Sequence, residues 1–199
     1  MADAPTLAFG AFTAPAKGVM VVFCDEGLKF GPATAKALGS ATGLVARAAK
    51  AERFTGKSGT SLELIMPEGL KAGRLAVIGV GKPADLKQKD IVKLGGTALG
   101  KLPKGASDLT IFADLPGKSM TAEQAADLAQ GVQLRGYAFD RYKTKRKEGE
   151  PAPVKRTVTV AVGDPAAARK AFVPRAGIAG GVLMARDLVN EPANILYPA

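Results

Sequence analysis

Histidine and tryptophan are absent from this chain of 199 residues, and cysteine occurs once, as Cys24. Without histidine the chain lacks the commonest general base and metal ligand, and it cannot form a Ser-His or Cys-His nucleophile pair. A single cysteine excludes a disulfide within the chain and a cysteine-based zinc site. Because Cys24 follows the apolar run of residues 19–23, we expect a buried, unreactive thiol.

The sequence also lacks a targeting or membrane-spanning signal. Its first basic residue is Lys17, so no basic segment opens the chain in the manner of a signal peptide. The longest uncharged apolar run late in the chain, residues 176–185, is too short and too rich in glycine to span a bilayer. These features predict a cytoplasmic protein that does not contact a membrane.

Short apolar runs predict the strands of a sheet. Residues 19–24 and 75–80 are almost continuously apolar, which is typical of strands covered on both faces. The weaker candidates are residues 7–9, 62–65, 109–113 and 158–162, with 62–65 expected at a sheet edge.

Helices are predicted between these strands, over residues 33–50, 84–99 and 122–139 and from 165 towards 189. Thr121 and Gln124 have the spacing of a capping box at the start of the third helix. The residues expected on one face of that helix are Ala125, Leu128, Val132, Gly136 and Phe139. Pro174 lies inside the last helix and is expected to kink or divide it.

Strands that alternate with helices predict an α/β protein of three layers, with a mostly parallel or mixed central sheet and helices on both faces. Residues 143–153 are charged and end in a Pro-Ala-Pro run, which indicates a surface loop before the last strand. We find no internal repeat in the sequence.

Glycine-rich segments invite comparison with phosphate-binding loops. The Gly-Lys-Ser triplets at 56–58 and 117–119 lack the glycine five positions earlier, where Ala51 and Phe112 stand. Residues 79–81 begin a Gly-x-Gly pattern whose third glycine is replaced by Ala84. All three segments are therefore predicted to be turns rather than phosphate sites.

The net charge of +10 is concentrated in residues 141–156, where seven Lys and Arg residues accompany Glu148 and Glu150. A basic run of this kind is typical of a solvated loop, and the alternative function is contact with nucleic-acid phosphates. The carboxylates are scattered, without the converging cluster that a hard cation needs.

Three segments resemble the leucine aminopeptidase (cytosol aminopeptidase) family. The most specific is Ala185-Arg186-Asp187-Leu188-Val189-Asn190-Glu191-Pro192-Ala193-Asn194, which is similar to the family's passage from its N-terminal to its catalytic domain. The second is Gly136-Tyr137-Ala138-Phe139-Asp140-Arg141-Tyr142-Lys143-Thr144-Lys145, similar to a helix end and basic turn. The third is residues 74–82 with Gly95-Gly96 after it.

The resemblance implies a two-domain aminopeptidase whose N-terminal domain is macro-domain-like. Its C-terminal domain is expected to hold two divalent metal ions, commonly zinc, manganese or magnesium, which activate water for peptide hydrolysis. The resemblance also implies a hexamer and a peptide substrate. The family's Asn-Thr-Asp-Ala-Glu-Gly-Arg metal-binding run does not occur in this sequence.

We therefore expect residues 1–184 to form a non-catalytic N-terminal α/β domain, with an assembly or access-shaping role. Residues 185–199 are expected to begin the connection to a catalytic domain absent from this chain. No catalytic, metal or cofactor residue is assigned in this chain.

Two alternative functions remain open. One is DNA binding, which the family resemblance permits, with Arg141, Lys143, Lys145, Arg146 and Lys147 as the expected phosphate contacts. The other is the binding of ADP-ribose, as macro-type folds do, at the glycine turns of residues 79–81 and 95–96.

Overall fold

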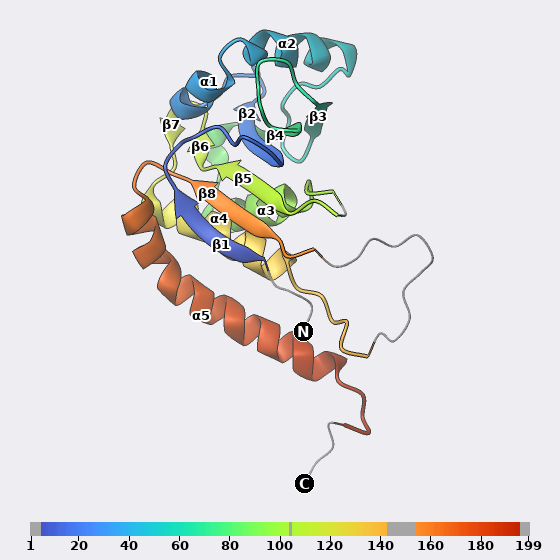
Figure 1. Ribbon diagram of the computed structural model, residues 1–199. Coiled ribbons are helices and arrows are strands. Elements are labelled where there is room, and N and C mark those ends of the chain that lie inside the picture. The colour runs from blue at the N-terminus through green and yellow to red at the C-terminus, as the bar shows by residue number, and fades with distance from the viewer. Residues whose placement is uncertain (1–4, 104, 143–153, 196–199) are drawn as a thin grey trace.

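A computed structural model describes residues 5–103, 105–142 and 154–195 of the chain. Six strands form one mixed sheet in the order β1-β8-β5-β2-β4-β3, and the first five run parallel to one another (Figure 1). Their bounds are β1 Thr6–Gly10, β2 Val19–Asp25, β3 Ser61–Ile65, β4 Arg74–Gly81, β5 Asp108–Phe112 and β8 Thr157–Ala161. The antiparallel strand β3 pairs only with β4, which confirms the predicted edge strand.

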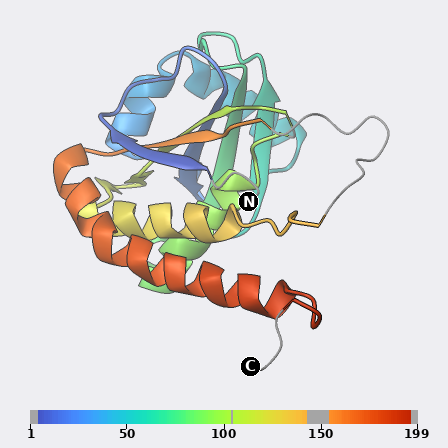
Figure 2. The ribbon, with the colours of Figure 1, turned by 60° about the horizontal axis from the view of Figure 1, so that its bottom comes forward.

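Helices cover both faces of the sheet, and the predicted three-layer α/β class is confirmed. One face carries α1 (Pro32–Leu38) and α2 (Ala41–Ala51), and the other carries α3 (Gln88–Leu99) and α4 (Ala122–Arg135) (Figures 1 and 2). The long helix α5 (Pro165–Asn190) packs against α4 on the side away from most of the sheet.

The central strands explain this layering because their side chains alternate between two buried faces. Val19, Val21 and Phe23 of β2 contribute to the core beneath α3 and α4. Met20 and Val22 contribute to the second core, beneath α1 and α2. A strand that is apolar from Val19 to Cys24 therefore becomes the centre of a sheet that helices cover on both sides.

The prediction of one continuous helix over residues 33–50 is wrong, because the structure has two helices there, α1 and α2. Gly39 adopts φ 50° and ψ −122° between α1 and α2, a backbone conformation that favours glycine and ends the first helix. The helix predicted from residue 84 also starts later. A short 3-10 turn spans Pro83–Asp85, and α3 then begins at Gln88, where Asp90 accepts a hydrogen bond from the Lys87 amide at 3.0 Å.

The capping box of α4 is confirmed, because Thr121 and Gln124 each accept a hydrogen bond from the other's backbone amide. The predicted helix is too long at its C-terminal end. Gly136 is its C-cap, and Phe139 lies beyond the helix. Among the described residues, no helix has the length and hydropathy needed to cross a membrane.

Helix α5 begins as predicted, with Asp164 as its N-cap and Pro165 in its first turn. Pro174 does not divide the helix, although both views show the first turns at an angle to the longer remainder (Figures 1 and 2). The Arg175 side chain donates a hydrogen bond to the Ala171 carbonyl at 2.9 Å, beside the backbone bond that proline removes. This contact supports the helix where its own ladder is weakest.

The inner side of α5 is held to α4 by a buried carboxylate. Asp127 of α4 is 4% exposed and accepts hydrogen bonds from Arg175 Nε at 2.5 Å and Gln88 Nε2 at 3.1 Å. Arg175 also pairs with Glu123 at 2.7 Å. A buried carboxylate needs such partners, so this contact fixes where α5 lies along α4.

Two glycines allow α3 and α4 to cross almost backbone to backbone. A Cβ atom at Gly95 would lie 1.9 Å from the Leu128 carbonyl oxygen, and one at Gly131 would lie 1.8 Å from the Val92 carbonyl oxygen. Both contacts are with backbone, which cannot swing away as a flexible side chain can. The crossing therefore requires glycine at both positions.

We predict that Gly131→Ala lowers the free energy of unfolding by about 1–3 kcal/mol, because the added methyl group forces α3 and α4 apart. The matched control is Gly43→Ala in α2, where an added Cβ meets nothing within 4 Å. Because alanine has a higher helix propensity than glycine, Gly43→Ala should stabilise the protein by up to about 1 kcal/mol. Urea unfolding followed by circular dichroism measures both values, and equal effects of the two substitutions would contradict the close crossing.

Candidate functional site

Two segments far apart in the sequence meet at the end of α5. Residues 137–142 follow α4, and residues 186–191 include the last turn of α5 and its C-cap. Hydrogen bonds and ion pairs join them, and we call their interacting residues the junction cluster. Its members are Tyr137, Arg141, Tyr142, Arg186, Asp187, Asn190 and Glu191.

Tyr137 is the centre of one half of the junction cluster. Its hydroxyl donates to Asp187 Oδ1 at 3.0 Å and accepts from Asn190 Nδ2 at 3.2 Å. The Arg186 guanidinium lies over its ring, 4.0 Å from the centroid, in a cation–π contact. Helical spacing explains the arrangement, because residues three and four positions apart share one side of α5.

Glu191 is the centre of the other half. Its side chain is only 7% exposed and accepts hydrogen bonds from the Arg141 guanidinium and the Tyr142 hydroxyl. The rings of Phe139 and Tyr142 pack together with their centroids 5.8 Å apart. The turn after α4 is thus tied to the C-terminal end of α5 by a largely buried carboxylate.

The junction cluster shifts the acidity of its tyrosines. The hydrogen bond to Glu191 is the largest cause that raises the pKa of Tyr142 above its usual range. Burial, with Asp187 beside the hydroxyl, raises the pKa of Tyr137. A raised pKa keeps both hydroxyls protonated as hydrogen-bond donors, so the geometry supports a structural clamp rather than a general base.

The single thiol is inert. Burial, followed by the neighbouring Asp25 carboxylate, raises the pKa of Cys24 to about 12. A thiol with this pKa carries almost no thiolate near neutral pH, and the thiolate is the nucleophilic form. The predicted buried, unreactive cysteine is confirmed.

The Gly-Lys-Ser triplets form turns that hold other elements. The Gly56 carbonyl accepts from the Gly81 amide at 3.0 Å, which ties the loop before β3 to the end of β4. Residues 117–119 belong to the hairpin of β6 (Asp114–Leu115) and β7 (Lys118–Ser119). Asp114 accepts from Ser119 Oγ at 2.6 Å and from the Thr34 amide at 2.7 Å, so this hairpin supports the start of α1.

The two glycine segments considered for ADP-ribose differ in structure. Residues 79–81 are the last three residues of β4 and not a turn, and the 3-10 turn follows them at Pro83–Asp85. Gly95 and Gly96 are not a turn, which corrects that interpretation. They lie inside α3, and Gly95 serves the crossing with α4.

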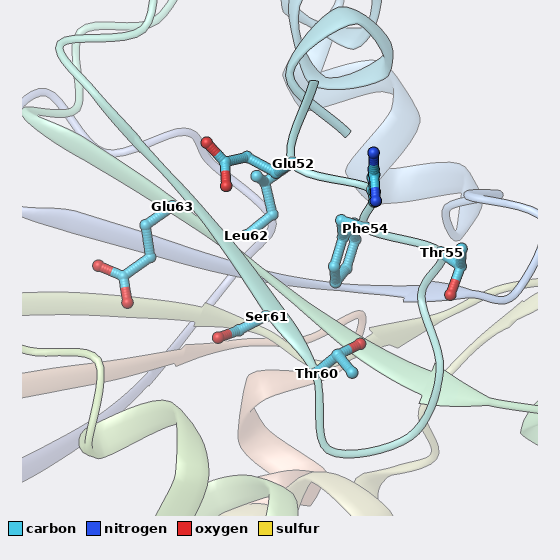
Figure 3. Close-up of a pocket in the computed structure, with 8 residues that line it drawn as sticks. Glu52, Phe54, Thr55, Thr60, Ser61, Leu62 and Glu63 are labelled. Carbon is cyan, nitrogen blue, oxygen red and sulfur yellow. The ribbon is translucent and has the colours of Figure 1, made fainter. Parts of the chain in front are cut away.

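A shallow groove of about 350 Å³ lies between the end of α2 and β3 (Figure 3). Phe54 and Leu62 lie between the strand and α2, whereas Ser61 and Glu63 point away from them (Figure 3). Glu63 pairs with Arg74 at 2.6 Å and with Lys101 at 3.2 Å. These hydrogen bonds outweigh partial burial and lower the pKa of Glu63, so its carboxylate is engaged in holding β3 to its neighbours.

The carboxylates do not converge on a metal centre within the described parts of the chain. No group of three His, Cys, Asp or Glu side chains there is placed to hold an ion. Asp25 accepts from the Gly27 and Lys29 amides in a turn, and Asp108 pairs with Lys17 at 3.2 Å. These groups, like Asp114 and Asp127, have structural partners, so they do not fit a bimetallic site.

The candidate phosphate contacts are only partly within the described residues. Arg141 is described and pairs with Glu191. Lys143, Lys145, Arg146 and Lys147 lie outside the described residues. Contact with nucleic acid at these positions stays a prediction.

Comparisons with known proteins decide the family. The sequence model of the cytosol aminopeptidase family, N-terminal domain, matches residues 21–146. The chain belongs to the cytosol aminopeptidase family. This confirms the resemblance drawn from residues 136–145 and 185–194.

Relatives in the cytosol aminopeptidase family match this chain over its whole length. Probable cytosol aminopeptidases of Rhodopseudomonas palustris and Nitrobacter winogradskyi are 52% and 53% identical to it over 198 residues. That of Afipia carboxidovorans is 53% identical over 199 residues. Each alignment covers 100% of this chain and 40% of the relative, so the chain spans about two fifths of their length.

Solved structures share the fold of this family member. A tomato leucine aminopeptidase variant has a TM-score of 0.74 at 23% identity, covering 100% of this chain and 41% of that one. The bottromycin maturation enzyme BotP, in complex with Mn, has a TM-score of 0.65 at 21% identity, covering 91% and 33%. At these identities the likeness establishes the fold.

Sequence reasoning found both segments of the junction cluster but not their contact. Residues 136–145 and 185–194, two of the three segments that carry the family resemblance, lie about 50 positions apart, and the structure shows that they bind each other. Helix α5 also continues through residue 185, where the domain boundary is predicted, and that boundary stays a prediction. The sequence signal for this contact was that residues 136–145 offer tyrosines and basic residues, whereas residues 185–194 offer the carboxylates Asp187 and Glu191.

We predict that Glu191→Gln lowers the pKa of Tyr142 towards its ordinary value, because a neutral amide replaces the anionic acceptor. Ultraviolet titration of tyrosinate measures this change, with Tyr142→Phe to assign the transition. The control is Glu68→Gln, because Glu68 is an exposed glutamate in the connection between β3 and β4. This substitution should leave the tyrosine titration unchanged.

The same pKa has a consequence for stability. The stabilisation from a raised tyrosine pKa is complete below the unfolded value of about 10 and is lost as the pH rises through the folded value. Tyr142→Phe should therefore change the stability at alkaline pH when Glu191 is present. The same substitution should have no such effect in the Glu191→Gln variant. Identical tyrosine titrations in the two proteins would rule out the Tyr142–Glu191 hydrogen bond.

Proposed function

We propose that the protein to which this N-terminal domain belongs is a metal-dependent aminopeptidase that releases N-terminal residues from peptides. The observation that carries the proposal is the family match, together with relatives named cytosol aminopeptidase that align with the whole of this chain. Two divalent metal ions, manganese or zinc, would be held in the part of the protein that this chain does not cover.

The described domain is proposed to be non-catalytic. Three of its carboxylates with little exposure have structural tasks: Asp114 supports α1, Asp127 anchors α5 and Glu191 joins the two segments of the junction cluster. The thiol of Cys24 is buried and protonated. These engaged groups support a role in assembly or in shaping access to a catalytic domain, within a cytoplasmic hexamer.

The proposal predicts a clear division of activity between two chain lengths. The full-length gene product should hydrolyse a leucine amide substrate, lose that activity with a chelator and regain it with Mn²⁺ or Zn²⁺. The chain of residues 1–199 should show no hydrolysis above background under the same conditions. A full-length protein that is inactive with both ions, or a short chain whose chelator-sensitive activity survives repurification, would contradict the proposal.

A further inference from the structure

The outer side of α5 is an exposed apolar surface. Only Ala168 and Ala179 of its 26 residues are buried. Large apolar side chains instead face solvent, with exposed fractions of 69% for Val173, 61% for Ile178, 65% for Met184 and 85% for Val189. Val182 and Leu188 are also exposed.

These residues form one continuous face because of helical geometry. With about 100° between successive residues, one half of the helix between positions 173 and 189 carries no charged or hydrogen-bonding side chain. We call it the outer α5 face; its members, all exposed, are Val173, Pro174, Gly177, Ile178, Gly181, Val182, Met184, Ala185, Leu188 and Val189. The face is about 24 Å long at 1.5 Å per residue.

The helix is nevertheless anchored, so this exposure is not that of a frayed end. Arg175 holds the inner side to Asp127, and Asp187 holds it to Tyr137. Phe172 packs against Phe9 of β1 with ring centroids 5.6 Å apart. The charged residues of the last turns thus lie on the sides of α5 that contact the domain, and the apolar residues lie on the side that does not.

We propose that the part of the protein outside residues 1–199, which is catalytic under the proposed function, packs on the outer α5 face. Large exposed apolar surfaces on soluble proteins mark interaction sites, and a charge-free face favours an apolar partner surface. The curated relatives, of which this chain covers 40%, contain the additional length that would supply that surface. The face reaches the end of α5, and Ile195 in the turn beyond it is 55% exposed.

Methionine oxidation tests this surface directly, because susceptibility of the thioether depends on solvent access. Met184 lies on the outer α5 face and is 65% exposed. Met66, after β3, is 76% exposed and is the internal control. Peroxide treatment of the 1–199 chain and of the full-length protein, followed by peptide mass spectrometry, gives both rates in each sample.

We expect the Met184 rate to fall about tenfold or more from the short chain to the full-length protein, with the Met66 rate unchanged. Equal Met184 rates in the two proteins would overturn the proposal. Protection of Met184 in the short chain that grows with protein concentration would assign the face to a second copy and also overturn it.

A pair of substitutions confirms that docking causes the protection. Ile178→Glu places a charge in the outer α5 face and should restore Met184 oxidation in the full-length protein towards the short-chain rate. Ile65→Glu makes the same change at a site that is 70% exposed and should leave Met184 protected. If Ile178→Glu leaves Met184 protected, the outer α5 face is not the contact. If Ile178→Glu fails to fold, the Met184 oxidation rates of the unsubstituted 1–199 chain and full-length protein decide whether the proposal holds.

Peptidase activity measured on the same full-length samples separates this inference from the proposed function. An active enzyme whose Met184 oxidises at the short-chain rate overturns the docking surface and leaves the proposed function standing. An inactive protein with a protected Met184 overturns the proposed function and leaves the docking surface standing.

Discussion

The close crossing of α3 and α4 at Gly95 and Gly131 sets the position of α4 relative to α3, and the position of α5 follows from that of α4. Backbone contact at both glycines leaves no room for a side chain, so the two helices have one separation. Helix α4 then presents Asp127, whose buried carboxylate needs the Arg175 guanidinium of α5. The position of α5 thus depends on a packing constraint between two other helices.

This stack gives α5 two different sides. The inner side is specified by polar contacts at Asp127 and Tyr137, together with the packing of Phe172 on Phe9. The outer side has no charge along several turns and no covering element among the described residues. This asymmetry is what we expect if, as proposed, the domain is non-catalytic and another part of the protein packs on α5.

The strands were predictable because the pattern of apolar residues within a strand indicates whether that strand is central or at an edge. The continuous apolar runs of β2 and β4 indicate central strands, and the alternation at residues 62–65 indicates an edge. Helix continuity was less predictable, since Gly39 ends α1 through a backbone conformation that composition does not reveal. The junction cluster and the outer α5 face depend on contacts between distant segments. Periodicity within one segment carries no information about such contacts, so only the structure shows them.

Within the described parts of the chain, helix α5 belongs to this domain and is held from one side. Native-state hydrogen exchange of the 1–199 chain tests this central claim most directly. We predict that amides near Ala179 of α5 are protected as strongly as those near Leu128 of α4, so that both exchange only through global unfolding. Rapid exchange throughout α5, with α4 still protected, would contradict the account.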